Sequence, residues 1–235
     1  MSIKVLLVDD SNLFRVGLCA LISAHDDFAV VAHLRGGKEA VQAALTGNPD
    51  MVVMDIMLSG INGLESVAQI KRRQPLVKIV ILTAHRTDDY VREALRLGAD
   101  GYVLKDASFD ELLMAMRYVA QGKKYLSPEV SGQLVQSFLH HEPNGAKGSR
   151  LEMLTGRERS ILQLIAEGRT NRKTAELLNV SPKTIEKQRA NLMHKLGLRN
   201  AAELTLVALE LGMIERPFAI SYLKKGESEG AGLSA

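Results

Sequence analysis

Five polar residues follow short apolar segments and have the side chains that a phosphoryl-transfer site needs. They are Asp9, Asp10, Asp55, Thr83 and Lys105. If the apolar segments are neighbouring parallel strands, these side chains meet at the carboxyl edge of one sheet. Clustered carboxylates repel one another unless a cation joins them, and ligand sets made only of oxygen favour Mg²⁺. Carboxylates, a metal ion, a hydroxyl and an ammonium group on one edge therefore predict phosphoryl chemistry.

Asp55 is the candidate nucleophile, since a carboxylate can attack a phosphoryl donor and become an acyl phosphate. Mg²⁺ and Lys105 would neutralise the phosphoryl oxygens, Thr83 would donate a hydrogen bond to one of them, and Ala84 leaves room for the group to approach. Each residue alone has an ordinary explanation, because Asp10 could cap a helix and lysine or threonine often ends a strand. Capping of a helix N-terminus would explain one aspartate, but it does not explain why three aspartates are predicted at the same edge of the sheet.

Alternating strand and helix patterns over the first 125 residues would position these side chains. Apolar, β-branched runs predict strands at 4–10, 28–34, 51–56, 78–84 and 101–105. Helical patterns lie between and after them, at 12–24, 37–46, 62–73, 87–97 and 108–121. Five such units predict a doubly wound α/β domain with a five-stranded parallel sheet, which we place at residues 1–123.

The rest of the chain has a different pattern. Proline and glycine mark a linker at 124–150, in which Ser127-Pro128 could start a short helix through Leu139 and the stretch 140–150 is expected to be flexible. Capping residues then open four helical segments, at Thr155, Thr170, Ser181 and Asn200. An all-α domain is therefore predicted at 151–216, followed by a flexible tail at 217–235.

Composition and charge limit the class of protein. Of the 235 residues, 46% are hydrophobic, which excludes wholesale disorder. No apolar run reaches the roughly 18 residues of a membrane span, and the single cysteine, Cys19, is interpreted as a small core residue. We expect a cytoplasmic protein. The charge is uneven, because residues 1–125 are neutral whereas residues 150–216 carry a net charge of +4, which points weakly to polyanions.

Residues 3–123 resemble the receiver domain of response regulators at the hallmark positions of that family. In chain order the matches are the acidic pair Asp9 and Asp10, the phosphoacceptor Asp55, the switch hydroxyl Thr83, the switch aromatic Tyr102 and the lysine Lys105. The resemblance implies phosphotransfer from a sensor histidine kinase and a bound Mg²⁺, with Asp9 acting through water. The implied metal ligands are Asp10, Asp55 and the backbone carbonyl of Met57.

The resemblance also implies a conformational switch. Thr83 would move toward the phosphate and Tyr102 would turn inward, which would repack the face made by segments 87–97, 101–105 and 108–121. One position departs from the family, because Ser59 stands where proline is usual in the loop after Asp55. Proline restricts the backbone, so Ser59 leaves this loop less constrained.

The helical patterns at 170–179 and 182–196 have the spacing of a helix-turn-helix, with Val180-Ser181 as the turn. The second helix carries Lys183, Thr184, Lys187, Gln188 and Arg189 near its start. Polar residues crowded there fit a recognition helix on double-stranded DNA, with Arg and Gln suited to bases and Lys and Thr to phosphates. A charged face that meets only solvent is the alternative.

Residues 151–212 resemble the LuxR-type helix-turn-helix of the NarL/FixJ regulators. The matching motifs are Leu154-Thr155-x-Arg157-Glu158, Leu164-Ile165-Ala166-Glu167-Gly168, Ser181-x-Lys183-Thr184-Ile185-Glu186 and Lys195-Leu196-Gly197. The resemblance implies that Lys183, Lys187 and Arg189 contact DNA. It also implies that the helix 201–211 dimerises, through Leu204, Leu206 and Val207. Departures from the family stand at Lys173, Thr174 and Gln188.

These patterns predict a phosphorylation-controlled transcription factor, whose receiver would catalyse its own Mg²⁺-dependent phosphotransfer and dephosphorylation. Phosphorylation of Asp55 would favour homodimers and release the recognition helix from the receiver domain. Two enzyme classes fit poorly: an aspartate-nucleophile phosphohydrolase needs a second acid where this chain has Met57, and no GxGxxG motif follows the first strand. A phosphorylation-independent regulator stays open, as does an interaction module whose helices bind RNA polymerase or another protein.

Overall fold

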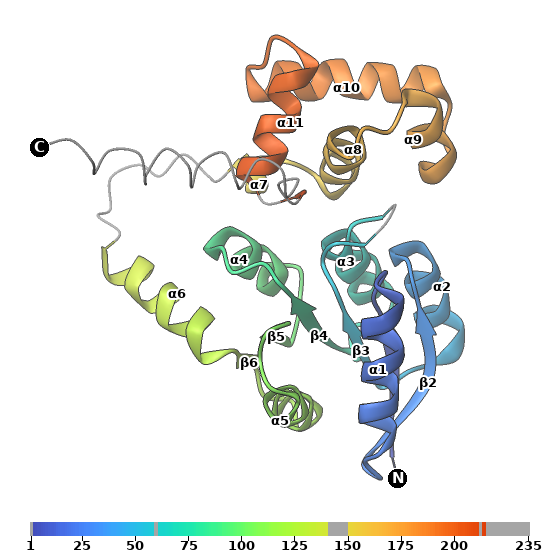
Figure 1. The fold of residues 1–235 in the computed structure, drawn as a ribbon, viewed down its shortest axis with the longest axis vertical. Coiled ribbons are helices and arrows are strands. Elements are labelled where there is room, and N and C mark those ends of the chain that lie inside the picture. Colours follow the sequence, from blue (N-terminus) through green and yellow to red (C-terminus); the bar gives the residue numbers. More distant parts are fainter. Residues whose placement is uncertain (1, 59–60, 141–149, 212, 215–235) are drawn as a thin grey trace, which may run out of the picture.

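The computed structural model describes residues 2–58, 61–140, 150–211 and 213–214, which form an N-terminal α/β domain and a C-terminal helical domain (Figure 1). The predicted flexible linker and tail lie largely outside the described residues, which omit 141–149 and 215–235. None of the helices that are described is long and apolar enough to cross a membrane.

The N-terminal domain is built on one parallel sheet in the order β2-β1-β3-β4-β5-β6. Its strands are β1 (Ile3–Val8), β2 (Phe28–Leu34), β3 (Met51–Met54), β4 (Lys78–Thr83), β5 (Gly101–Leu104) and β6 (Tyr125–Leu126). The first five confirm the predicted strands. The prediction of a five-stranded sheet was wrong by one strand, because β6 has only two residues and is too short to give a sequence period.

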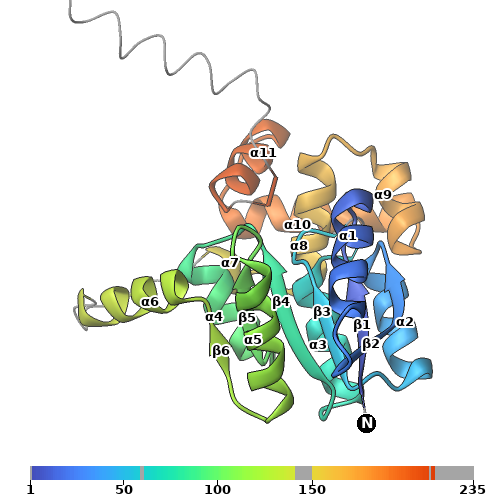
Figure 2. The same cartoon turned by 60° about the horizontal axis from the view of Figure 1, so that its bottom comes forward.

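Helices cover both faces of this sheet (Figure 2). One apolar layer joins it to α1 (Asn12–Ser23) and α5 (Phe109–Ala120). A second layer joins it to α2 (Gly37–Gly47), α3 (Gly63–Arg73) and α4 (Asp88–Arg96). Because both faces are buried, the strands read as continuous apolar runs in the sequence. Cys19 packs on the first layer and is half-buried, as expected for a small core residue.

The helix α6 (Pro128–His140) extends the N-terminal domain and begins where Ser127-Pro128 predicted. It contacts α4, and its residue Val130 is buried. The side chain of Arg86, in the loop after β4, forms ion pairs with Asp106 and with Glu129 of α6. The first turn of α6 is therefore tied to the loops at the carboxyl edge of the sheet.

The C-terminal domain consists of α7 (Arg150–Met153), α8 (Gly156–Ala166), α9 (Asn171–Leu178), α10 (Pro182–Leu196) and α11 (Ala201–Glu210). The four predicted capping residues each accept a hydrogen bond from a backbone N–H of the first turn. Thr155 and Glu158 form a complete capping box. Ile185 and Leu192 are fully buried in this domain, as the helix period predicted, and Leu196 is partly buried.

The C-terminal domain lies over the carboxyl edge of the sheet, above the ends of β3 and β4 (Figure 1). Its contacts with the N-terminal domain include those of α8 with α3 and of α7 with α4. The helix α10 lies on the far side of the domain, away from the sheet (Figure 1). The edge that carries the predicted site therefore faces the second domain.

Candidate functional site

The carboxyl edge of the sheet brings together the carboxylates and the ammonium group that the sequence predicted. Val8 of β1 pairs with Met54 of β3, so Asp9 and Asp55 leave neighbouring strands at the same level. Nζ of Lys105, which follows β5, lies 2.7 Å from Oδ2 of Asp9 and 2.7 Å from Oδ2 of Asp55. Both carboxylates are buried, so this ion pair is only weakly screened by water.

Burial and charge act in opposite directions on these groups. Burial raises the pKa of Asp9, and the hydrogen bond and charge of Lys105 offset only part of that effect. Burial alone would lower the pKa of Lys105, but the charges and hydrogen bonds of Asp55 and Asp9 raise it. Both pKa values are therefore raised, for opposite reasons: burial dominates at Asp9, whereas the two carboxylates outweigh burial at Lys105. The ring of Phe14, 4.9 Å from Nζ of Lys105, adds a cation–π contact.

The oxygen atoms at this edge suit a hard cation. Among the described residues, no three acidic, histidine or cysteine side chains are grouped as a ready-made metal site, and Lys105 stands between two of the carboxylates. Oδ1 of Asp55 is nevertheless buried with no hydrogen-bond partner in the described part of the chain. A buried carboxylate oxygen of this kind favours a cation or a donor. Asp10 and Met57 line the same cleft as Asp55, so the predicted metal ligands fit.

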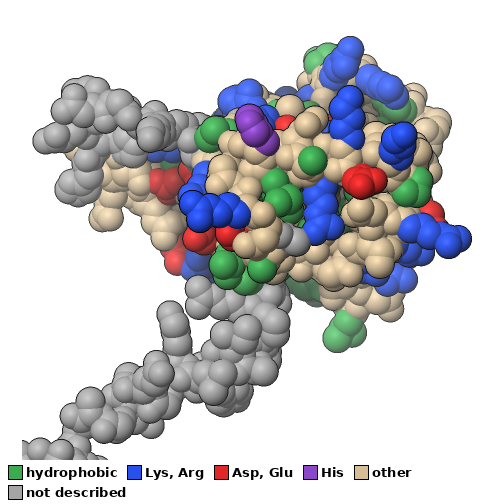
Figure 3. All heavy atoms as spheres, turned by 90° about the horizontal axis from the view of Figure 1, so that it is seen from above, with side chains coloured by type: hydrophobic (Ala, Val, Ile, Leu, Met, Phe, Trp, Pro, Cys, Tyr) green, Lys and Arg blue, Asp and Glu red, His purple; other side chains and the backbone are tan. Residues whose placement is uncertain are grey.

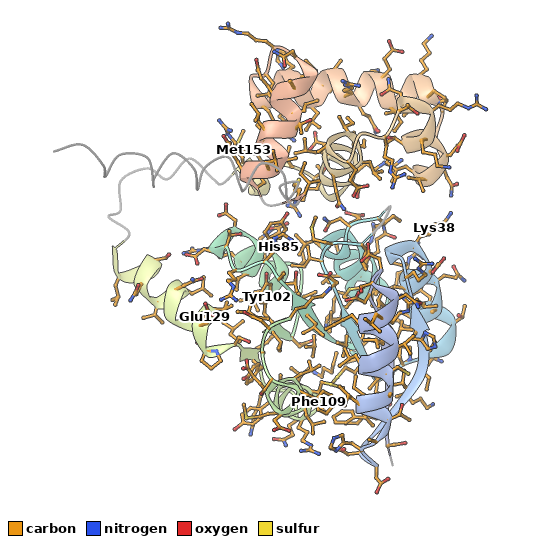
Figure 4. The ribbon with its side chains drawn as sticks, viewed as in Figure 1. Lys38, His85, Tyr102, Phe109, Glu129 and Met153 are labelled. Atoms are coloured by element: carbon orange, nitrogen blue, oxygen red, sulfur yellow. The ribbon has the colours of Figure 1, made fainter. Side chains whose placement is uncertain are left out.

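The two predicted switch residues are already buried. Oγ1 of Thr83 accepts a hydrogen bond from the N–H of His85 at 3.4 Å, and the hydroxyl of Tyr102 donates to the carbonyl of His85 at 2.8 Å. Burial raises the pKa of Tyr102 well above its usual value. In Figure 4, His85 lies at the upper edge of the domain with Tyr102 beneath it. Tyr102 therefore has the inward position that the resemblance links to phosphorylation.

The helix-turn-helix presents part of its predicted DNA-binding surface to solvent. Lys183 and Lys187 are exposed on α10. Thr184 is engaged in the helix cap with Ser181, and Nη1 of Arg189 lies 3.4 Å from Oδ1 of Asn171. Figure 3 looks down on this end of the molecule, where Lys and Arg side chains are scattered over the visible face. Two lysines can therefore meet a polyanion without rearrangement, whereas Arg189 would have to leave its contact.

Comparison with known proteins shows the family to which the chain belongs. Residues 5–117 match the family described as response regulator receiver domain, and residues 152–208 match the bacterial regulatory proteins of the luxR family. A transcriptional regulatory protein DegU of Brevibacillus brevis is 31% identical over 225 residues, which are 91% of this chain and 95% of the relative. The chain is a response regulator of the receiver–LuxR family.

Two further likenesses agree with this assignment. The oxygen regulatory protein NreC of Staphylococcus haemolyticus is 35% identical over 215 residues, covering 90% of this chain and 99% of the relative. A two-component response regulator of the LuxR family from Aurantimonas, solved as a crystal structure, is 30% identical with a TM-score of 0.58. It matches 60% of this chain and all of that chain. The relatives are transcriptional regulators rather than enzymes, so the enzyme alternatives are excluded.

The receiver domain and the DNA-binding domain of this response regulator enclose a cleft of about 860 Å³ at the candidate site. The receiver side of the cleft includes the residues Asp10, Asp55, Met57, Thr83, Ala84, His85 and Lys105. The opposite side belongs to the ends of α8 and α11 and includes Gln163, Ala166, Glu167, Arg169, Thr205 and Leu209. A group bound to Asp55 would therefore face both domains.

Buried polar contacts hold the two domains together, and no local sequence pattern pointed to them. Nη2 of Arg159 in α8 lies 2.5 Å from Oε1 of Glu93 in α4, and both side chains are almost fully buried. Gln163 accepts a hydrogen bond from Nδ2 of Asn62 at 3.1 Å and donates to the carbonyl of Leu58 at 3.4 Å. In the sequence these residues look like ordinary polar positions on helix surfaces, since nothing local indicates the opposite domain.

The structure amends two expectations about the DNA-binding domain. Leu204 and Val207 are buried in the domain's own core, whereas Leu206 is 58% exposed, so only Leu206 of the three predicted dimer residues is available to a second molecule. The expected release of the recognition helix also needs restating, because the receiver contacts α7 and α8 and the cleft faces α11, while α10 is turned away. At two of the positions where the sequence departs from the family pattern, Thr174 is buried and the side chain of Lys173 forms an ion pair with Glu176.

Proposed function

We propose that Asp55 accepts a phosphoryl group from a sensor histidine kinase and that this modification controls binding of the chain to promoter DNA. The observation that supports the proposal most directly is the pairing of Lys105 with Asp55 through one carboxylate oxygen, while the other oxygen is buried without a partner. That oxygen faces no competing donor among the described residues. It is therefore suited to a metal ion or to phosphorus.

The residues at this edge suit in-line phosphoryl transfer. A carboxylate oxygen of Asp55 would form a bond to phosphorus while the bond from phosphorus to the donor's imidazole nitrogen breaks, and the imidazole keeps that electron pair. Mg²⁺, when held by Asp10, Asp55 and the carbonyl of Met57, would supply charge neutralisation for the phosphoryl oxygens. Lys105 would contribute a second positive charge, and the hydroxyl of Thr83 would donate a hydrogen bond.

The cleft gives the phosphoryl group a physical route to the DNA-binding domain. The end of α8 at Ala166 and Glu167 lines the cleft opposite Asp55. A helix C-terminus carries a partial negative charge, and the carboxylate of Glu167 adds to it. A phosphoryl group brings roughly −1.5 to −2 charge at neutral pH, so it would repel this end of α8. Arg169 opposes the repulsion in part, and it lies 3.6 Å from Glu167.

The expected partners follow from this mechanism. Domain opening would expose the α11 side of the DNA-binding domain and favour a homodimer, in which two copies of α10 read half-sites about one helical turn apart. Lys183 and Lys187 are the exposed residues best placed for DNA phosphates. A cytoplasmic location would fit binding to promoter DNA, and contact with RNA polymerase would follow from promoter binding.

A labelling experiment tests the phosphoacceptor. The full chain is incubated with phosphoramidate and Mg²⁺, and phosphoprotein is separated on a phosphate-affinity gel. We expect labelling of the wild type and none of Asp55→Asn, because the amide is not a nucleophile. Asp50→Asn is the matched control, since Asp50 is an exposed aspartate at the opposite edge of the sheet, where it accepts a hydrogen bond from the N–H of Lys4. Normal labelling of Asp55→Asn would refute the assignment.

DNA binding that needs no phosphoryl group is a second candidate, favoured by the exposure of Lys183 and Lys187 on α10. Fluorescence anisotropy with promoter DNA separates the two. If phosphoramidate raises the affinity of the wild type and leaves Asp55→Asn unchanged, phosphorylation controls binding. Equal affinities under all conditions would support the phosphorylation-independent regulator.

A further inference from the structure

A buried arginine lies beneath the loop that carries the acidic pair, and no step of the proposed phosphoryl transfer uses it. Arg15 belongs to α1 and is only 4% exposed. Its Nη1 donates a hydrogen bond to the carbonyl of Asp9 at 2.7 Å, and its Nη2 donates to Oδ1 of Asn12 at 2.8 Å. Its Nε is buried without a hydrogen-bond partner in the described part of the chain. Burying a cation costs free energy, so its position beside this loop needs a physical reason.

The direction of helical side chains explains how Arg15 reaches the loop. Side chains of a helix lean toward its N-terminus, so the side chain of residue 15 extends back over the first turn of α1. Its guanidinium group then meets the end of β1 at Asp9, while Asn12 of the first helical turn holds its second nitrogen. The planar, forked guanidinium is therefore fixed at two points, which suits arginine better than lysine.

The two aspartates of the pair are held in different ways. The side chain of Asp9 is fixed from both sides, since Oδ1 accepts a hydrogen bond from the N–H of Ser11 at 2.8 Å and Oδ2 lies 2.7 Å from Nζ of Lys105. Asp10 is the member of the pair that lines the cleft. The peptide between Asp9 and Asp10 sets the direction in which Asp10 leaves the loop. Among the described residues, Arg15 alone donates to the carbonyl of that peptide.

We infer that Arg15 is a positioning residue for Asp10, which holds the acidic loop in the conformation that binds Mg²⁺. This inference rests on the proposed Mg²⁺-dependent function of Asp55. Without the bond from Arg15, the peptide between Asp9 and Asp10 loses a restraint, and the binding of Mg²⁺ then has to order it. The carbonyl of Asp9 would also lose a hydrogen bond that it makes in a buried place.

Charge and position predict opposite effects when Arg15 is replaced by an uncharged residue. Loss of a positive charge near a cation site strengthens cation binding, because one repulsion is removed. Loss of the restraint weakens cation binding, because the ion must order the loop. The direction of the change in Mg²⁺ affinity therefore separates a positioning residue from a charge that only balances the carboxylates.

The test is a Mg²⁺ titration of the isotope-labelled full chain, followed by the amide resonances of the folded protein. A hydrogen bond from a charged donor corresponds to about tenfold in an equilibrium constant, so Arg15→Met should raise the dissociation constant for Mg²⁺ by about that factor. Arg15→Lys keeps a donor for the carbonyl of Asp9 and should restore part of the affinity. Asn12→Ala removes the second attachment of Arg15 and should raise the dissociation constant by a smaller factor. The matched control is Arg72→Met, at an exposed arginine in the last turn of α3, which should bind Mg²⁺ as the wild type does.

Resonances of the folded protein report Mg²⁺ affinity separately from stability, so a variant that is only less stable keeps the dissociation constant of the wild type. An unchanged or lower dissociation constant of Arg15→Met would overturn the inference while leaving the proposed function intact, and so would an Arg15→Lys variant that binds no better. If Arg15→Met does not fold, the exposed position Asn12 decides, because an unchanged affinity of Asn12→Ala would overturn the inference equally. If the wild type itself bound no Mg²⁺, the proposed metal-dependent function would fail first.

Discussion

The buried ion pair between Glu93 and Arg159 makes domain docking sensitive to a single charge. Glu93→Gln keeps the shape of the side chain and removes the negative charge that faces Arg159 and Arg96. The side chains of Glu93 and Arg159 are 1% and 3% exposed, so water screens their attraction weakly when the domains are docked. In an open conformation both groups are hydrated, and the substitution costs little. The variant should therefore favour the open form.

The size of the effect follows from the contact that is lost. A hydrogen bond to a charged group contributes about 1.5–3 kcal/mol, and a value of about 2 kcal/mol corresponds to roughly a thirtyfold change in the ratio of docked to open chains. A chain docked about 30 to 1 would become about evenly divided between the two forms. Small-angle X-ray scattering of the full chain should detect this as a larger radius of gyration. Hydrogen exchange in α4 and α8 should rise at the same time.

Acid gives a second measure of the same contact. Burial would raise the pKa of Glu93, but the hydrogen bonds from Arg96 and Arg159 outweigh burial and lower it below its usual value of 4.5. A lowered pKa stabilises docking above pH 4.5, and that contribution is lost as the pH falls through the lowered pKa. The domains of the wild type should therefore separate as the pH falls below 4.5. In Glu93→Gln, which has no carboxylate at this position, acid should not add to domain separation in this way.

The matched control is Glu176→Gln, which removes the charge of an exposed glutamate that also pairs with two cations, Arg172 and Lys173. Exposed pairs contribute about 0–1 kcal/mol, and Glu176 lies outside the domain interface, so its scattering should match the wild type. If Glu93→Gln gave the same radius of gyration and the same exchange as the wild type, the ion pair would not control docking, and our reasoning would be refuted.

Two further predictions concern DNA binding and self-association. Lys187→Ala should weaken binding to all DNA sequences alike and reduce the slope of log affinity against log salt by about one unit, because Lys187 is exposed on α10 and suited to a phosphate. An unchanged slope in anisotropy titrations would place Lys187 away from the phosphates. Leu206→Lys should reduce self-association in sedimentation experiments and leave stability unchanged, because Leu206 is exposed. Leu204→Ala should instead lower the free energy of unfolding by about 2–5 kcal/mol, since Leu204 is fully buried. If both variants lost self-association equally and kept their stability, Leu204 would not be a core residue and Leu206 would not be the only one of the two at the surface.

Much of the receiver site could be predicted from the sequence because its geometry is set by local elements. Strands of a parallel sheet end at one edge, so Asp9, Asp55 and Lys105 had to converge once the strands were recognised. The same logic placed the helix caps at Thr155 and Ser181, where short-range hydrogen bonds decide the structure.

Other features depended on contacts that no short pattern records. In α11, Ala, Leu and Val residues fall on most sides of the helix, so periodicity could not separate the buried Leu204 and Val207 from the exposed Leu206. The two-residue strand β6 exists because the backbone of Tyr125 finds a partner beside Gly101 in β5. The domain interface likewise depends on how two separately folded domains meet, which the local sequence does not specify.

The polar contacts of that interface fit the proposed switch. Arg159, Glu93, Gln163 and Asn62 are polar groups that find equivalent partners in water when the domains separate. An interface closed by large apolar side chains alone would resist opening, because every exposed apolar surface costs free energy. The polar contacts lower the cost of opening, so we expect an added charge at Asp55 to shift the balance between the docked and open forms. The carbonyl of Leu58, which accepts a hydrogen bond from Gln163, lies three residues after Asp55, so an added charge at Asp55 would act close to this contact.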